Sequence, residues 1–264
     1  MARAPLVRPT DAPPAAHRIE SDAGVDRQQT PNHSDAALEL PHHVAIIMDG
    51  NRRWARNRGL HELEGHPAGV EAIRNVLRQA RRRGIRALTL YAFSRENWAR
   101  GDAEVTALFG LLEAAIRNET DELRAQGVRV RMIGRMDELP PETRGSIDDA
   151  LAATGDGTEM VLTIAFNYAG RTELVDAIRR IVASGIAPGA VDEALVASSL
   201  YTAGTPDPDL VIRTGGEERL SNFLIWQSAY AELVTTETLW PDFGAGELDA
   251  ALAEYASRQR RFGR

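Results

Sequence analysis

The chain has 264 residues, 43% of them hydrophobic and 26% charged, which is the composition of a globular protein large enough to bury its core without disulfide bonds. It contains no cysteine, which excludes a disulfide framework, a thiolate metal site and a thiol nucleophile, and all 31 basic residues are arginine, which excludes P-loop nucleotide-binding and Schiff-base enzymes because both need a lysine. The formal net charge of −7 weighs against nucleic acid as the main partner, because a protein that binds phosphate backbones needs a basic face.

Residues 1–40 differ in composition from the rest of the chain. They are rich in proline, alanine, aspartate, glutamine and histidine and show little apolar periodicity, which predicts a disordered tail before a folded domain at residues 41–264. The first residues lack the extended apolar segment of a signal peptide. No apolar run approaches the roughly 20 residues that a membrane-spanning helix needs. We therefore expect a cytoplasmic protein whose contact with a membrane would be peripheral.

Beyond Pro41 the pattern predicts alternating strands and helices. Short apolar runs predict strands at residues 43–48, 87–93, 128–133, 160–166, 210–213 and 232–235. Apolar residues three and four apart predict helices over residues 70–83, 103–126, 141–153, 172–183 and 246–260. This alternation predicts one α/β domain with a mostly parallel sheet of about six strands, covered on both faces. Ligands bind at the carboxyl ends of such strands, which puts four polar residues on one rim: Asp49, Ser94, Asn167 and Arg213.

The first candidate site follows the first strand, at residues 49–55. An aspartate, a glycine and an asparagine precede two arginines where a helix can begin, and free backbone N–H groups and arginines attract anions. Because Asp49 would repel a phosphate unless a cation lay between them, the combination indicates a Mg²⁺–diphosphate site. An Asx turn with solvated arginines fits the same residues, and spacing alone does not separate the two. His61 and His66 are five residues apart, which is not the zinc-protease spacing of four.

Two later segments also combine polar side chains with a strand end. In residues 91–98 and Arg100 the polar side chains either face the rim or hold a loop by their own hydrogen bonds. Residues 212–223 contain two arginines, two glycines, a threonine and a serine, which is the composition of a second phosphate-binding loop, although a plain surface loop is the alternative. Three aromatic residues follow at once, at Phe223, Trp226 and Tyr230, so we expect a ligand with a charged head and an apolar tail.

These segments together resemble the undecaprenyl diphosphate synthase family of cis-prenyltransferases. The resemblance covers essentially all of residues 41–264, with its motifs in family order at residues 43–55, 65–69, 91–98, 167–171 and 209–242. It implies a single α/β domain with a hydrophobic tunnel that acts as a homodimer. It also implies a Mg²⁺-dependent transferase that condenses isopentenyl diphosphate with an allylic diphosphate, releases diphosphate and builds a Z-configured polyprenyl diphosphate. The DDxxD motif of trans-prenyltransferases is absent.

The resemblance also implies roles for individual residues. Asp49, with Glu232, would hold the magnesium. Asn51, His66 and Ser94 resemble the group that removes a proton in the last step of each condensation. The isopentenyl diphosphate would be bound by Arg213, Arg219 and Ser221, and the allylic diphosphate would be surrounded by Gly50, Asn51, Arg53, His66 and Arg100. Further substrate-binding positions are Arg52, Trp54, Glu62, Arg95, Asn97 and Trp98. The terminal Arg261 and Gly263 match an element that reaches toward the partner's site.

Several residues depart from the family pattern. Arg52 stands where the best-known members have glycine, Arg95 occupies a small polar position and Ala169 replaces a glycine. Glu62 stands where a phosphate-binding arginine is usual, and our hypothesis is that Arg52 supplies the missing positive charge. The departures leave room for a short-chain product or an irregular, head-to-middle coupling of allylic diphosphates.

Two rival functions and the length of the product remain to be considered. A non-catalytic partner subunit would be expected to lose site residues that are present here, and a general phosphate-binding module would not explain the apolar segments. Product length depends on the shape of the tunnel. We expect four residues to line it: Ala92, Leu108, Leu112 and Met160.

Overall fold

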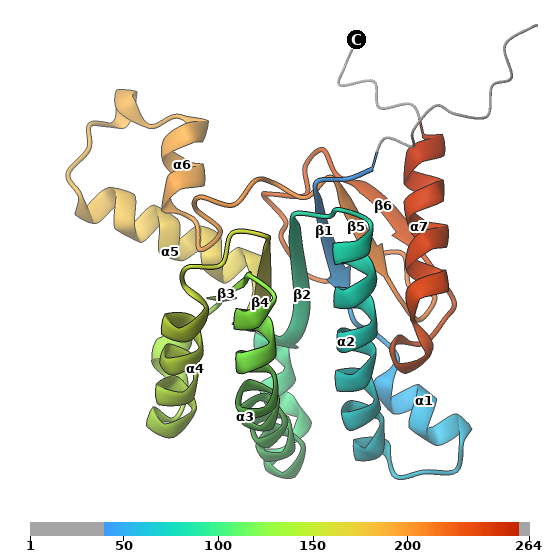
Figure 1. Ribbon diagram of the computed structural model, residues 1–264. Helices are drawn as coiled ribbons and strands as arrows, with labels where there is room; N and C mark the ends of the chain where they lie inside the picture. Colours follow the sequence, from blue (N-terminus) through green and yellow to red (C-terminus); the bar gives the residue numbers. More distant parts are fainter. Residues whose placement is uncertain (1–39, 259–264) are drawn as a thin grey trace, which may run out of the picture. The chain divides into compact units, whose positions relative to one another are not determined.

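The computed structural model describes residues 40–258. The predicted tail lies outside the described residues except for Leu40, and so do the terminal Arg261 and Gly263. The described part of the chain forms one sheet with helices packed on it (Figure 1). Its strands are β1 (His43–Ile47), β2 (Ala87–Ser94), β3 (Val128–Ile133), β4 (Met160–Tyr168), β5 (Leu210–Arg213) and β6 (Glu232–Thr235). Its helices are α1 (Asn51–Asn57), α2 (Gly65–Arg82), α3 (Asp102–Ala125), α4 (Pro141–Thr154), α5 (Gly170–Ala183), α6 (Glu193–Ser199) and α7 (Ala245–Ser257).

All neighbouring strands of the described sheet run parallel, in the order β3-β4-β2-β1-β5-β6. Strands β2, β4 and β3 lie on one side of β1, and the chain then returns to add β5 and β6 on the other. The order of the strands therefore reverses between β1 and β5. The crevice above such a reversal is where open α/β sheets bind their ligands. The prediction of a mostly parallel sheet of about six strands is confirmed.

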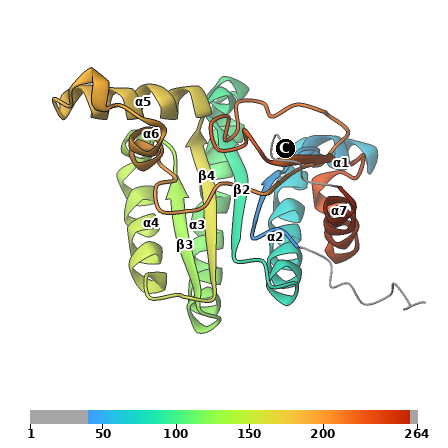
Figure 2. The ribbon, with the colours of Figure 1, turned by 90° about the horizontal axis from the view of Figure 1, so that it is seen from above.

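The two faces of the sheet are covered differently. Helices α2, α3, α4 and α7 stand side by side on one face (Figure 1), where α2 and α7 pack on Val44, Ile46 and Leu88. The opposite face, formed by residues such as Ala45 and Ile47, is covered by Phe223 and Leu224 and by partly buried residues around them. Seen from above (Figure 2), α5 and α6 lie together beyond β4. Both faces of β1 are buried along its whole length, which explains its continuous apolar sequence.

Helix α2 begins five residues before its predicted start, at Gly65 rather than Val70. The sequence Gly-His-Pro-Ala-Gly resembles a loop, but Pro67 lies in the first helical turn, where proline is tolerated. The two glycines allow a close approach to α1. A Cβ atom on Gly65 would lie 2.0 Å from the carbonyl oxygen of Asn51, and one on Gly69 would lie 2.7 Å from the Oδ1 atom of Asn51. This contact brings the first turn of α2 beside the loop that follows β1.

Candidate active site

An ion pair joins the ends of β1 and β5 at the reversal of strand order. Arg213 is 4% exposed, and its Nη2 atom donates to the Oδ2 atom of Asp49 at 2.8 Å. Its Nη1 atom donates to the backbone oxygen of Arg219 and to the Oγ atom of Ser221, at 2.5 and 2.6 Å. The Nε atom of Arg213 has no hydrogen-bond partner although it is buried. Buried polar groups are nearly always paired, so this donor is a candidate for a ligand contact.

The loop after β5 is held in an unusual backbone conformation. Ser221, Asn222 and Leu224 have φ angles of 47°, 63° and 42°, a region that residues other than glycine rarely occupy. A Cβ atom on Gly215 would lie 2.4 Å from the Nη2 atom of Arg53, so this backbone passes directly under the arginine. Such strain persists only where the surrounding structure fixes it, and it gathers at binding sites.

A charged pocket lies above these strand ends. Five arginines and two carboxylates contribute to its lining, so its walls carry more positive than negative groups although the whole chain is negative. Asp49 is one of the carboxylates, and its Oδ1 atom lies 3.4 Å from the Nη2 atom of Arg53. The residues that line the charged pocket are Met48, Asp49, Gly50, Asn51, Arg52, Arg53, Arg56, His66, Arg100, Glu217 and Arg219.

Glu104, in the first turn of α3, connects three charged or titratable groups beside this pocket. Its carboxylate lies 3.1 Å from Arg100, 3.5 Å from the Nε2 atom of His66 and 3.9 Å from Arg52. Burial lowers the pKa of His66, more than the neighbouring Glu104 carboxylate raises it, so the ring is neutral at pH 7. The sequence analysis missed Glu104. An acidic residue in the first turn of a helix is common and gives no signal of its own.

Glu62 does not face the charged pocket as an isolated carboxylate. It forms an ion pair with Arg52, and its Oε1 atom lies 3.4 Å from the Nε atom of Arg56. The three side chains together carry one net positive charge. Arg56, which the sequence analysis did not select, therefore belongs to the same group as Arg52 and Glu62, two of the residues that depart from the family pattern.

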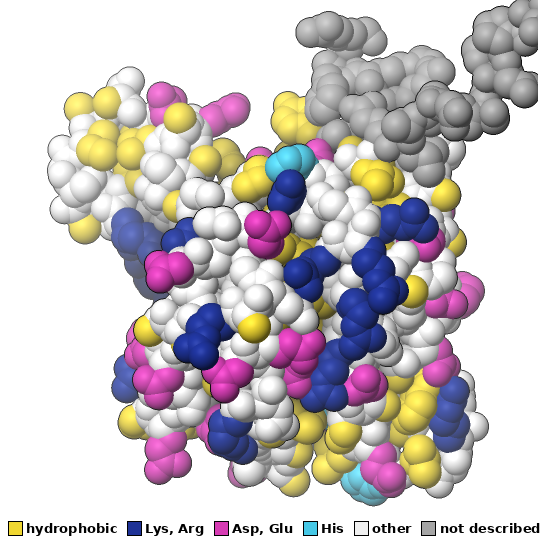
Figure 3. Space-filling view, viewed as in Figure 1, with side chains coloured by type: hydrophobic (Ala, Val, Ile, Leu, Met, Phe, Trp, Pro, Cys, Tyr) yellow, Lys and Arg dark blue, Asp and Glu magenta, His cyan; other side chains and the backbone are white. Residues whose placement is uncertain are grey.

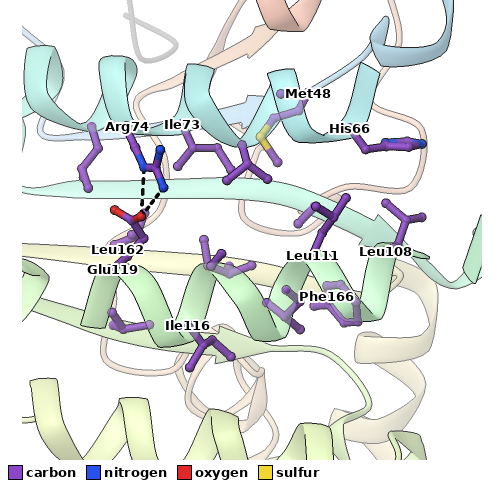
Figure 4. A pocket seen from close by; sticks show the side chains of 18 of the residues that line it. Met48, His66, Ile73, Arg74, Leu108, Leu111, Ile116, Glu119, Leu162 and Phe166 are labelled. Atoms are coloured by element: carbon purple, nitrogen blue, oxygen red, sulfur yellow. Dashed lines mark hydrogen bonds and ion pairs between the residues drawn. The ribbon is translucent and has the colours of Figure 1, made fainter. Parts of the chain in front are cut away.

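An apolar pocket lies between α2 and α3, with the sheet as its floor (Figure 4). The α2 side contributes Val70, Ile73 and Leu77. The α3 side contributes four leucines and one isoleucine, and with the other lining residues they recur at helical spacing, so each helix turns one face toward the pocket. Of the four residues expected to line a tunnel, Ala92, Leu108 and Leu112 do so. Met160 does not: it is 2% exposed and packs in the core, so the structure corrects that expectation.

The two pockets share Met48, Asn51 and His66. Two polar atoms at this junction are buried without a hydrogen-bond partner, the Oδ1 atom of Asn51 and the Nε2 atom of His66. A ligand that occupies both pockets would place its polar head among the arginines and its apolar tail between α2 and α3. The junction between head and tail would then lie against these two unpaired groups.

The sequence analysis expected the apolar part of the site at the wrong residues. Phe223 is fully buried on the opposite face of the sheet, where it stacks on Tyr91 with ring centroids 4.6 Å apart. Tyr230 is 79% exposed. Neither residue lines the apolar pocket, which is formed instead by α2, α3 and the strands below them.

Several predicted site residues have structural partners outside both pockets. Ser94 donates its hydroxyl hydrogen to Glu96, and Asn97 accepts the backbone N–H of Ser94, so this turn is closed by its own side chains. Arg95 pairs with Glu138. Trp98 donates to Asn167, and Trp54 donates to Asp242. Side-chain hydrogen bonds and ion pairs thus hold residues 94–98, both within the turn and to Glu138, Asn167 and Asn222, and the substrate-binding role of these residues stays a prediction.

Within one chain, the structure does not bring Glu232 to Asp49. Glu232 begins β6, is paired in register with Leu210 and forms an ion pair with Arg258. Arg213 is paired with Thr235, three residues further along β6, which corresponds to about 10 Å. Asp49 lies at the carboxyl end of the sheet, beside Arg213, whereas Glu232 lies at the opposite end of its strand.

Comparison with known proteins gives one consistent result. Residues 47–263 match the family model of undecaprenyl diphosphate synthase. The chain is 50% identical to the isoprenyl transferase of Heliobacterium mobile over 228 residues, which cover 85% of this chain and 88% of that relative. It is 47% identical to isoprenyl transferase 2 of Bradyrhizobium diazoefficiens, over 92% of this chain and 96% of that relative.

Solved structures show the same relationship. Lavandulyl diphosphate synthase from Lavandula x intermedia, in complex with dimethylallyl diphosphate, aligns with a TM-score of 0.83 at 38% identity, covering 85% of this chain and 99% of that one. A probable undecaprenyl diphosphate synthase from Campylobacter jejuni aligns with a TM-score of 0.73 at 30% identity, covering 86% of this chain and 99% of that one.

The buried His66 makes stability depend on pH. Because the pKa of His66 in the folded chain is lowered from 6.5, the unfolded chain binds the proton more readily. The free energy of unfolding therefore has its full value above pH 6.5 and falls as the pH drops below it. We expect His66→Asn to lose less stability than the wild type between pH 7.5 and pH 5, measured by urea unfolding at both pH values. The exposed His42→Asn is the control, and an equal loss in His66→Asn and wild type would contradict the assignment.

Proposed function

From the finding that the chain belongs to the undecaprenyl diphosphate synthase family and is an isoprenyl transferase, we propose how its two pockets divide the reaction. The charged pocket joins isopentenyl diphosphate to an allylic diphosphate. The apolar pocket receives the growing Z-configured hydrocarbon. The observation that carries the proposal is the junction between the two pockets. A polyprenyl diphosphate has a charged head and a long apolar tail, and Asn51 and His66 contact both pockets.

The arginines account for binding of the diphosphates. Arg213, with its unpaired Nε atom, and Arg219 are suited to the isopentenyl diphosphate. Arg53 and Arg100 are suited to the allylic diphosphate, with Gly50 allowing the backbone to turn at φ 113°. Ser221 holds the Arg213 guanidinium in place. Arg95, Asn97, Trp98 and Trp54, which have partners elsewhere, would act by shaping the site.

A magnesium ion fits the donors at the charged pocket. Asp49 is a third exposed and lies among arginines that would draw diphosphate oxygens to it, and Mg²⁺ is commonly held by one or two carboxylates together with phosphate oxygens. Asp49 would hold the ion. Bound there, Mg²⁺ would neutralise the charge of a departing diphosphate. In the register of β5 and β6, Glu232 lies three residues before the position paired with Arg213, so its register does not support a role at the metal within one chain.

The reaction divides the work among the chain's own residues. As the C1–O bond of the allylic substrate breaks, the arginines stabilise the charge on the leaving diphosphate. The alkene carbon C4 of isopentenyl diphosphate attacks the resulting allylic cation, and loss of one proton restores a double bond. His66 is neutral, and its Nε2 atom makes no hydrogen bond and lies 3.5 Å from the Glu104 carboxylate, so it can accept that proton and share it with Glu104, with Asn51 orienting the substrate. Ser94, which donates to Glu96, contributes at most through that loop.

The proposal is tested by incubating the protein with Mg²⁺, labelled isopentenyl diphosphate and allylic primers from C5 to C20. We expect incorporation into extended prenyl diphosphates, and loss of incorporation in Asp49→Asn. The comparisons lend no support to irregular coupling, which would give products from allylic diphosphates alone. Failure of every primer, or products formed without isopentenyl diphosphate, would contradict the proposal.

The Arg52–Glu62 pair gives a second prediction. Removing Arg52 would leave Glu62 partly unneutralised beside the allylic diphosphate, so we expect Arg52→Gly to raise the KM for the allylic substrate about tenfold, equivalent to about 1.4 kcal/mol. The variant Arg52→Gly/Glu62→Gln removes both charges and should return the KM close to the wild-type value. If Arg52→Gly left KM and kcat unchanged, Arg52 would not supply charge to this site.

We also propose that the chain is a homodimer and that its contact includes the outer face of α5. Val175, Ile178 and Val182 form an apolar stripe on that helix, and they are 45%, 56% and 73% exposed. Such a stripe is usually covered by a partner. We expect Ile178→Glu to dissociate the dimer in sedimentation experiments, while Leu60→Glu, at an exposed apolar residue elsewhere, leaves it intact. A monomeric wild type, or a dimer unaffected by Ile178→Glu, would contradict this.

Within residues 40–258 no helix is long and apolar enough to cross a membrane. The cytoplasmic location and the peripheral contact with a membrane stay predictions.

A further inference from the structure

Polar contacts join α2 and α3 at three levels. At the charged pocket His66 lies 3.5 Å from Glu104. Further along, the Nε atom of Arg74 donates to Glu119 at 2.9 Å, and at the far end Arg81 donates to the side chain and backbone of Gln126 at 2.6 and 3.1 Å. The apolar pocket lies between these two helices and is lined by the middle pair, Arg74 and Glu119 (Figure 4).

Between the first two contacts the two helices advance by unequal lengths. From His66 to Arg74 there are eight residues of α2, or about 12 Å, whereas from Glu104 to Glu119 there are fifteen residues of α3, or about 22 Å. From the second contact to the third, both helices advance by seven residues. The extra length of α3 therefore lies beside the charged pocket, and this is the stretch from which Leu108, Leu111 and Leu112 face the apolar pocket.

The Arg74–Glu119 pair lies at the side of the apolar pocket and does not block its length. The side chains are 38% and 21% exposed, so the pair separates the pocket from solvent. Residues beyond it on both helices, Leu77 and Leu123, still line the pocket. Arginine side chains also gather over the outer surface of α2 (Figure 3), where Arg78 and Arg82 are exposed, one and two turns beyond Arg74.

We propose that Arg74 and Glu119 form a latch on the side of the apolar pocket, and that the strength of the latch limits the length of the product. With the pair made, the growing hydrocarbon is confined between the helices and the sheet. With the pair parted, the chain extends sideways between α2 and α3, and further condensations become possible. This inference rests on the proposed function, because it assumes that the apolar pocket receives the growing chain.

The exposure of the pair suits a contact that opens. Ion pairs that are in contact with solvent contribute little to stability and are weakened by salt. Arg74 also pairs with Glu71 on its own helix, so parting the latch does not leave the arginine without a carboxylate. When the Arg74–Glu119 pair separates, the hydrocarbon can occupy the space between α2 and α3 and displace water from it. Removing apolar surface from water is favourable, so a product that is long enough to reach this space stabilises the open state.

Product analysis tests the latch. We expect Glu119→Gln to shift the products of the incorporation assay to longer chains by at least one isoprene unit, and the charge-reversed R74E/E119R to move them back toward the wild-type length. The control is Arg83→Gln, which removes an ion pair to Asp249 on the opposite side of α2 and should leave the products unchanged. Unchanged or shorter products in Glu119→Gln would overturn the proposal.

A second measurement does not depend on catalysis. Because the chain has no cysteine, a single thiol introduced by Leu77→Cys reports access to the apolar pocket beyond the latch; Leu77 is 7% exposed. A water-soluble maleimide should label Leu77→Cys/Glu119→Gln several-fold faster than Leu77→Cys, and Leu77→Cys/Arg83→Gln no faster. Equal rates in all three would overturn the latch even if the enzyme elongates normally. Faster labelling in a protein that incorporates no isopentenyl diphosphate would support the latch and contradict the proposed function instead.

Discussion

The buried Arg213 and its ion pair with Asp49 set the geometry of the site. The pair spans the place where the strand order reverses, so it ties the loop after β1 to the loop after β5. Removing Asp49 would leave the buried Arg213 guanidinium without its carboxylate, which is destabilising because a buried charge needs a partner. The same guanidinium also fixes Ser221 and the backbone of Arg219. Both loops that we propose to bind diphosphate are therefore connected through one side chain.

The apolar half of the site depends on a different constraint, the length of α3. A parallel sheet with helices on one face normally packs those helices against one another, and a pocket between them must be held open. Here α3 advances fifteen residues and α2 only eight between their first two polar contacts, and such contacts connect the two helices at three levels. The hydrocarbon space is thus bounded by packed side chains on the sheet and by a charged contact at its side.

Sequence reasoning predicted the sheet well because parallel strands buried on both faces are mostly apolar runs, as in β1 and β5. It placed Asp49, Ser94, Asn167 and Arg213 correctly on one rim, since the carboxyl ends of parallel strands coincide. It could not find Glu104, which becomes important only because α3 brings it beside His66. It assigned the apolar wall to Phe223 and Tyr230 because they are adjacent in sequence to the phosphate-binding loop, whereas the actual wall is assembled from helices about 40 residues apart. Contacts distant in sequence leave no local pattern.

The central claim is that diphosphates bind beside the carboxylate of Asp49 only when a cation lies between the carboxylate and the diphosphate. It is tested most directly by measuring the affinity for a non-reactive analogue of the allylic diphosphate in wild type and Asp49→Asn, each with and without Mg²⁺. Without Mg²⁺ the carboxylate of Asp49 repels the analogue, so Asp49→Asn should bind it more tightly than the wild type. With Mg²⁺ the order should reverse, because only the wild type can hold the ion between carboxylate and diphosphate. If the two proteins kept the same order of affinity under both conditions, the account would be contradicted.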